Sequence, residues 1–174
     1  MLCLGHFLFD PRRFTTNDFT LSNWSHINQI GTRWVEHNFA AGPIAPAISD
    51  FDDLLPALDV WLSVANHEIH YVSHILPTLR WTGGLLGVRL RFEPEDLSKL
   101  SSEYILAFNA AKEVKQAGSD AQGTPAPIPL WPQSLREFLD RRLVRTFLIR
   151  AYSLDPAKIN LPLDGEARPQ PLPA

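Results

Sequence analysis

Short runs of alternating apolar and polar residues mark the first half of the chain and are typical of β-strands. The clearest run is Leu85–Phe92, in which apolar residues share one face while Arg89 and Arg91 share the other. The pair Gly83-Gly84 precedes this run, so we expect a tight hairpin turn between it and another strand at Ile69–Trp81. Three more strands are expected, at Leu2–Phe9, Asp18–Trp24 and Gly31–Phe39.

Apolar residues recur at helical spacing in three other segments. A first helix is expected over residues 53–65, where Asp50, Asp52 and Asp53 place negative charge near its start. A second helix is expected to begin at Pro94 and to end at Gly118. A third is expected to run from Ser134 to Tyr152.

Together these elements predict an α+β fold. We expect a small antiparallel or mixed β-sheet with a packed helix in the first half, then two amphipathic helices and an extended proline-rich tail. The α+β domain would span residues 1–117, and a proline-rich linker would span 118–132. An amphipathic helix over 133–153 would pack on that domain or on a neighbouring subunit, and residues 154–174 would form the tail.

Composition narrows the class of protein. The chain has 174 residues, 45% of them hydrophobic, which suits one folded domain. Its net charge of −3 gives no basic field for non-specific nucleic-acid binding. Its one cysteine, Cys3, rules out a disulfide within the chain and any zinc site built on two cysteines. No apolar run is long enough for a membrane helix and no secretory signal is apparent, so we expect a soluble, cytoplasmic protein.

The segment NHEIHYVSH at 66–74 holds three histidines and is the strongest candidate for chemistry. The metalloprotease pattern needs histidines four residues apart that bracket a glutamate. His67 and His70 are only three apart, and no glutamate follows His70. On a strand, His70 and His74 would lie about 13 Å apart, too far to share one zinc ion. We therefore predict no metal site here, and keep His67, His70 and His74 as the only weak metal candidates.

No catalytic residue or cofactor site is predicted elsewhere. The chain has no nucleophile elbow, phosphate-cradling loop or dinucleotide fingerprint. The arginines of the 134–152 helix could contact an acidic partner. Because Glu137 and Asp140 are interleaved with them, a solvated helix face is the favoured interpretation.

The start of the chain carries a family resemblance. Met1–Phe9 has the pattern Met-x-x-Leu-Gly-x-Phe-x-Phe, and Trp24, Ile30-Gly31 and Arg33 follow in fixed order before a return strand at Trp34–Phe39. Both features resemble the tail protein U family, small structural proteins of contractile-tailed phages and phage-derived pyocins. The order of elements fits the family over roughly residues 1–95, whereas residue matches are confined to 1–34. The family's glycine pair is reduced to Gly42, and the 134–152 helix and proline-rich tail lie outside its pattern.

The resemblance implies a non-enzymatic subunit of a phage tail or tail-like contractile particle, assembled in the host cytoplasm. Such a subunit would form a homo-oligomeric ring that contacts the tube, the hub or neighbouring baseplate proteins, without a membrane or a specific nucleic acid. Two other classes stay open: a metal-dependent hydrolase using the histidines, and a cytoplasmic adaptor that binds a partner through the 134–152 helix. The interface candidates are Phe7, Phe9, Trp24, Trp34, Trp131, Arg141, Arg142 and Arg145.

Overall fold

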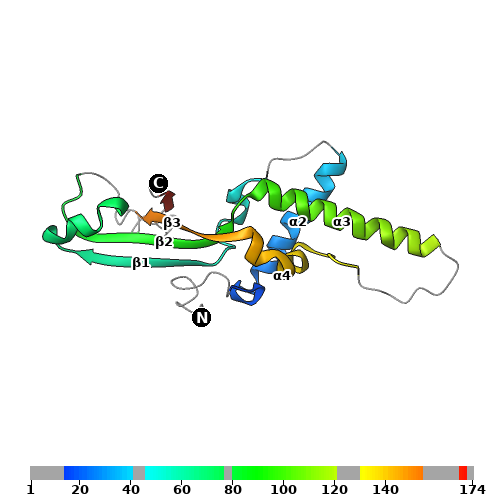
Figure 1. The fold of residues 1–174 in the computed structure, drawn as a ribbon, viewed down its shortest axis with the longest axis horizontal. Helices are drawn as coiled ribbons and strands as arrows, with labels where there is room; N and C mark the ends of the chain where they lie inside the picture. Colours follow the sequence, from blue (N-terminus) through cyan, green and yellow to red (C-terminus); the bar gives the residue numbers. More distant parts are fainter. Residues whose placement is uncertain (1–13, 41–45, 77–79, 121–129, 155–168, 172–174) are drawn as a thin grey trace.

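The computed structural model describes residues 14–40, 46–76, 80–120, 130–154 and 169–171. These residues form an α+β fold, as the sequence predicts: a four-stranded antiparallel sheet in the order β1-β2-β3-β4 and the helices α2, α3 and α4. The molecule is elongated. The sheet extends as an arm from one side of a helical body, and α3 extends from the other side (Figure 1).

The arm is built on the antiparallel pair β1 (Ala57–Val64) and β2 (Gly84–Pro94). The predicted strand Leu85–Phe92 is confirmed as part of β2. Its apolar face includes Leu86 and Phe92, both fully buried. The arm therefore buries apolar residues along β2 from near its tip to the helical body.

The strand β3 (Phe147–Leu154) pairs with β2 on the side away from β1, and the short β4 (Pro169–Pro171) pairs with β3. The chain between β2 and β3 makes two helices, α3 (Leu97–Asp120) and α4 (Leu135–Thr146), before it returns to the sheet. A long excursion thus separates two strands that are neighbours in space.

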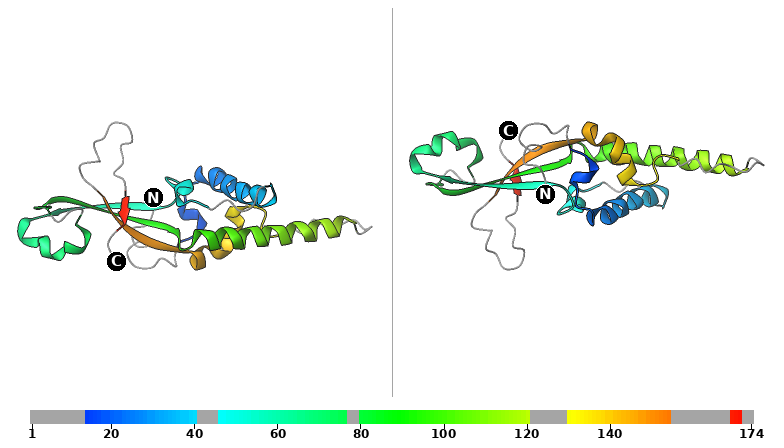
Figure 2. Two further views of the ribbon diagram at one scale, coloured as in Figure 1. Left: turned by 90° about the horizontal axis from the view of Figure 1, so that it is seen from above. Right: turned by 90° about the horizontal axis from the view of Figure 1, so that it is seen from below.

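The main core lies where α2 (Asn23–Ala40), α3 and α4 meet the base of the sheet (Figure 2). Gly31 permits the close approach of α2 to α4, because a Cβ there would lie 2.8 Å from Cβ of Leu135 and 3.1 Å from the Tyr104 ring. Short 3₁₀ helices complete the described fold: η2 (Thr16–Asp18), η3 (Ile48–Phe51), η4 (Asn66–Tyr71) and η5 (Ser73–Ile75).

The strands predicted at Asp18–Trp24 and Gly31–Phe39 are wrong, since most of this region is α2. The buried residues of α2 follow helical spacing: Trp24, Ile27, Ile30, Trp34 and Val35. Isoleucine, valine and tryptophan are also frequent in strands, so their identity pointed to the wrong element. The return strand that the family resemblance implied at Trp34–Phe39 is therefore not formed. The predicted strand Leu2–Phe9 and Gly42 lie outside the described residues.

The helix predicted over 53–65 is also wrong, because most of this segment is β1. Asp53 has a positive φ of 64°, and Pro56 disfavours a helical conformation for the residue before it, so the chain enters β1 extended. The strand predicted at Ile69–Trp81 is instead largely the 3₁₀ helices η4 and η5 in its described part. These helices stand at the end of the arm (Figure 1). Gly83 and Gly84 have positive φ values of 107° and 113°, but the tight hairpin predicted there is wrong, because Gly84 pairs with Val64 and residues 65–83 connect the two strands.

The second predicted helix is confirmed as α3, which continues past Gly118 to Asp120. The third is confirmed only as far as Thr146, because the chain then becomes β3. Residues 133–153 are therefore not one appended helix: they supply both a core helix and an inner strand of the sheet. The predicted linker 118–132 and tail 154–174 lie largely outside the described residues.

Candidate functional site

The histidine segment lies at the tip of the arm, in η4 and η5, and not on a strand. The predicted 13 Å separation of His70 and His74, which assumed a strand, therefore does not apply. His67 and His70 are exposed, and the ring of His70 lies 3.9 Å from that of Tyr71. The carboxylate of Glu68 accepts a hydrogen bond from the backbone N–H of Ala65 at 3.0 Å and so caps the turn.

This tip does not assemble a metal-binding group within the described residues. No set of three or more His, Cys, Asp or Glu side chains in that part of the chain lies close enough to hold a metal ion. What the tip does present is an exposed aromatic side chain, since Tyr71 is 72% accessible to solvent. Aromatic residues of this kind are frequent anchors in protein interfaces.

Two of the predicted interface residues belong to the core. Trp24 is 4% exposed and Trp34 is 6% exposed, so neither side chain is available to a partner. Trp131 is half-buried: its indole N–H donates to the carbonyl of Glu137 at 2.9 Å, and its ring stacks on Phe138. Phe7 and Phe9 lie outside the described residues.

The arginines of α4 differ in exposure. Arg141 and Arg145 are exposed and Arg142 is half-buried. The Arg141 guanidinium lies over the Trp131 ring, 4.9 Å from its centroid, which covers part of that aromatic face. The apolar stripe of α4 is buried in the core (Leu135, Phe138, Leu139 and Leu143), so it cannot serve the groove-binding mode of an adaptor.

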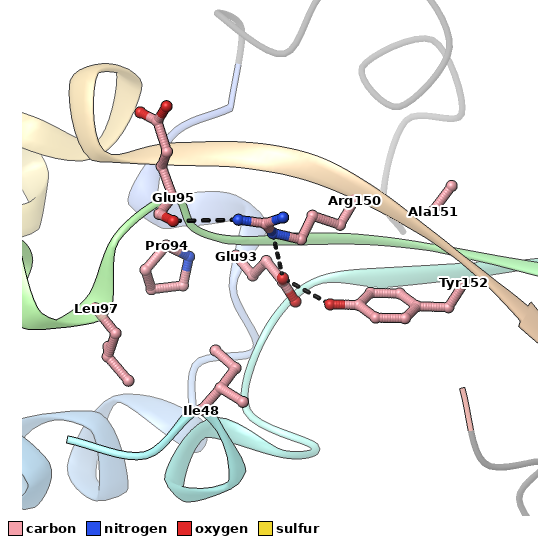
Figure 3. A pocket seen from close by; sticks show the side chains of 8 residues that line it. All are labelled: Ile48, Glu93, Pro94, Glu95, Leu97, Arg150, Ala151 and Tyr152. Atoms are coloured by element: carbon pink, nitrogen blue, oxygen red, sulfur yellow. Dashed lines mark hydrogen bonds and ion pairs between the residues drawn. The ribbon is translucent and has the colours of Figure 1, made fainter. Parts of the chain in front are cut away.

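A charged cluster at the base of the arm was not predicted from the sequence. Glu93 on β2 is only 3% exposed, yet it is a carboxylate. Its oxygens form ion pairs with the guanidinium groups of Arg91 and of Arg150 and accept a hydrogen bond from the Tyr152 hydroxyl at 2.7 Å (Figure 3). We call these four residues the Glu93 cluster.

The cluster extends to the body of the protein. Arg91 also pairs with Asp52 at 3.1 Å, just beyond η3, and its guanidinium lies over the Tyr152 ring at 5.0 Å. Arg150 donates a further hydrogen bond to the carbonyl of Glu95. The cluster therefore ties β2 to β3 and to the segment before β1, at the place where the arm leaves the body.

Two groups of the cluster, Arg91 and Tyr152, have raised pKa values. Burial opposes the charge on Arg91, but the hydrogen bond and negative charge of Glu93 outweigh it, so the pKa of Arg91 is raised. Burial, followed by the Glu93 hydrogen bond, raises the pKa of Tyr152 and keeps its hydroxyl protonated. Arginine cannot exchange protons near neutral pH, so this arrangement suits a structural ion-pair network better than acid–base catalysis.

A shallow pocket of about 500 Å³ borders the cluster and is lined by Ile48, Glu93, Pro94, Glu95, Leu97, Arg150, Ala151 and Tyr152 (Figure 3). Arg150 has 47% of its side chain exposed here, whereas Glu93 has 4%. The pocket thus presents one arginine whose charge is already partly neutralised.

Exposed apolar side chains lie on both projecting parts, and Leu21, Ile48 and Val144 are exposed elsewhere. The arm carries Leu62, Leu85 and Tyr71, and α3 carries Leu106 and Val114, which are 71% and 58% exposed.

Protein-family models, curated proteins and solved structures give no match to this chain. Among the described helices, none has the length and apolar character needed to cross a bilayer. The function is therefore best argued from these surfaces.

Proposed function

We propose that this protein is a non-catalytic structural subunit of a protein assembly, and that the assembly is a phage tail or a tail-like contractile particle. The observation that carries the first part is the shape of the molecule. A small core supports two projections, the arm and α3, that point in opposite directions (Figure 1). A chain that orders such projections exposes much surface for its size, and neighbouring subunits in an assembly would cover it.

The arm is suited to reach a neighbour. Its tip presents Tyr71 beside His70 in η4, and Glu68 caps the first turn of this 3₁₀ helix. Its base is fixed by the Glu93 cluster, which would hold the arm at one angle to the body. Contacts made at the tip would then fix the position of one subunit relative to the next.

The phage-tail part of the proposal is supported by the opening residues. Met1–Phe9 carries the tail protein U pattern in the sequence. The second shared feature gives less support, because Trp24, Ile30-Gly31 and Arg33 lie on one helix and not ahead of a return strand. In such a particle the subunit would form a ring and contact the tube, the hub or baseplate neighbours.

Particle incorporation tests the proposal. An epitope-tagged chain is expressed in the phage or host that encodes it, and tail particles are purified on a density gradient. We expect the tagged chain to sediment with the particles, and a chain found only in the unassembled fraction would refute the tail assignment.

Variants of the tip test the role of the arm. Tyr71→Ala and His70→Ala should lower the particle-bound fraction without changing the melting temperature, since both side chains are exposed. Val144→Ala is the matched control, because Val144 is 51% exposed but lies on α4, away from the arm tip. Equal incorporation of all three variants would show that the tip makes no essential contact.

A further inference from the structure

The helix α3 is longer than the body that supports it. Its first half packs inward through Leu100 and Tyr104, which are 1% and 2% exposed. Residues 112–116 are all exposed, and the helix projects beyond α2 and α4 (Figures 1 and 2). The outward side of α3 is therefore open to another molecule along most of its length.

The outward side carries a regular pattern. Lys99, Leu106 and Glu113 recur at intervals of seven residues, so they lie on one face of the helix, and all three are exposed. Leu106, the central residue, is 71% exposed although it is a large apolar side chain. Ser102 and Ala110, one turn to either side of it, are small and exposed, so a second helix could approach closely.

The pattern is complementary to itself when it is reversed. A positive charge lies seven residues before Leu106 and a negative charge lies seven residues after it, each about 10 Å along the helix axis. If a second copy of α3 lies antiparallel with its Leu106 on the first, Lys99 of each copy faces Glu113 of the other. A parallel arrangement would instead place lysine against lysine and glutamate against glutamate.

We propose that two copies of this protein associate through α3, in an antiparallel two-fold contact centred on Leu106. The contact satisfies the requirement of a two-fold interface that one surface patch be complementary to itself. Antiparallel helices also align their dipoles favourably. The apolar area is small, so the pairing is weak in dilute solution and is strengthened where many copies are held together. It is tested on purified protein and does not rest on the proposed function.

Disulfide trapping tests the register. In a Cys3→Ser background, Leu106→Cys should form a disulfide-linked dimer on mild oxidation. Lys99→Cys and Glu113→Cys should each cross-link poorly alone, but should cross-link to each other when the two variants are mixed. Val144→Cys is the control for chance collision, because that side chain is exposed on α4. Circular dichroism and thermal melting check that each variant is folded.

Charge reversal tests the complementarity. Lys99→Glu should slow cross-linking through Leu106→Cys roughly tenfold, because two attractive pairs become repulsive. Adding Glu113→Lys in the same chain should restore the rate, since the charges then match again. The inference is overturned if Leu106→Cys cross-links no faster than Val144→Cys. It is also overturned if Lys99→Cys links to itself faster than to Glu113→Cys, which would indicate a parallel pair.

Discussion

Replacing Glu93 by glutamine tests whether the Glu93 cluster holds the arm to the body. Glutamine keeps the size of the side chain but removes its charge, and its amide nitrogen would face a guanidinium donor. Arg91 would then remain with only 11% of its side chain exposed. Removing one partner of a buried ion pair costs about 3–5 kcal/mol. We expect about 3 kcal/mol, the lower end of that range, because Arg91 keeps Asp52 and Arg150 is 47% exposed.

Urea unfolding, followed by circular dichroism, measures this loss. A chain of this size loses about 2 kcal/mol of stability per molar urea, so Glu93→Gln should lower the midpoint by about 1.5 M. Glu95→Gln is the matched control: it is the same chemical change two positions along, at an exposed carboxylate. Arg150→Gln should cost about 1 kcal/mol or less, as exposed ion pairs do.

The comparison shows whether the Glu93 cluster is a buried ion-pair network that stabilises the fold or a group of charges that water screens. If Glu93→Gln and Glu95→Gln unfold at the same urea concentration, water screens the cluster and it does not stabilise the fold. A double variant, Glu93→Gln with Arg91→Gln, adds a second check. It should be more stable than the sum of the single losses implies, because the stranded arginine charge is gone.

Three further predictions concern the core and the arm tip. Burial and then the charge of Glu137 raise the pKa of Tyr104 to about 12 from its ordinary value of 10.0. The protonated tyrosine therefore contributes its full stabilisation below pH 10 and loses it as the pH rises towards 12. At pH 11 the free energy of unfolding should be about 1.4 kcal/mol lower than at neutral pH from this group alone. Tyr104→Phe should show a smaller fall in urea midpoint between pH 8 and pH 11 than the unchanged protein, and an equal fall would contradict the assignment. Gly31→Ala should destabilise the protein by about 1–3 kcal/mol in thermal or urea unfolding. The new Cβ would meet Leu135, and this cost exceeds the gain from the higher helix propensity of alanine. Ser25→Ala, at an exposed position of the same helix, should leave the stability unchanged. Equimolar Zn²⁺ should leave the melting temperature unchanged, and a rise that His70→Ala abolishes would revive the hydrolase hypothesis.

Sequence periodicity predicted β2 and α3 correctly, because apolar residues recur along each of them at the spacing of its secondary structure. Leu85–Phe92 alternates because the two faces of β2 differ in chemistry: one is apolar, and the other carries Arg89 and Arg91, which form ion pairs. The helix α3 was also predicted, since Leu100, Tyr104 and Phe108 recur at helical spacing and pack in the core. Periodicity is informative for elements whose two faces differ in polarity.

Other elements were missed because a different influence decided their structure. The segment Phe147–Leu154 continues the apolar content of α4, but its pairing with β2 outweighs helix propensity. The sequence of β1 does alternate, with Leu58, Val60, Leu62 and Val64 on one face, but Trp61 on the other face also matches helical spacing with Leu58 and Leu62, and that match pointed to a helix.

The Glu93 cluster depends on these missed elements. Arg91 and Glu93 share a face of β2, as their spacing predicts, but Arg150 and Tyr152 were expected on a helix. Only the pairing of Arg91 with Arg150 across the sheet brings the four side chains together. A charged residue two positions from an arginine on a strand is the one local signal of such a cluster, and it does not identify the cross-strand partners.

The two proposed contacts, taken together, constrain the assembly. In the proposed assembly, contacts through the arm tip would join unlike surfaces and close into a ring, whereas the proposed α3 contact would join like surfaces about a two-fold axis. The arm and α3 project from opposite sides of the helical body, so the arm tip and the face of α3 around Leu106 can each meet a different neighbour (Figure 1). If each member of one ring pairs with a member of a second ring, the two rings together contain an even number of copies. Native mass spectrometry of the purified assembly should therefore give even copy numbers, and Leu106→Glu should halve them by separating the two rings. An odd copy number would exclude the combination of both contacts.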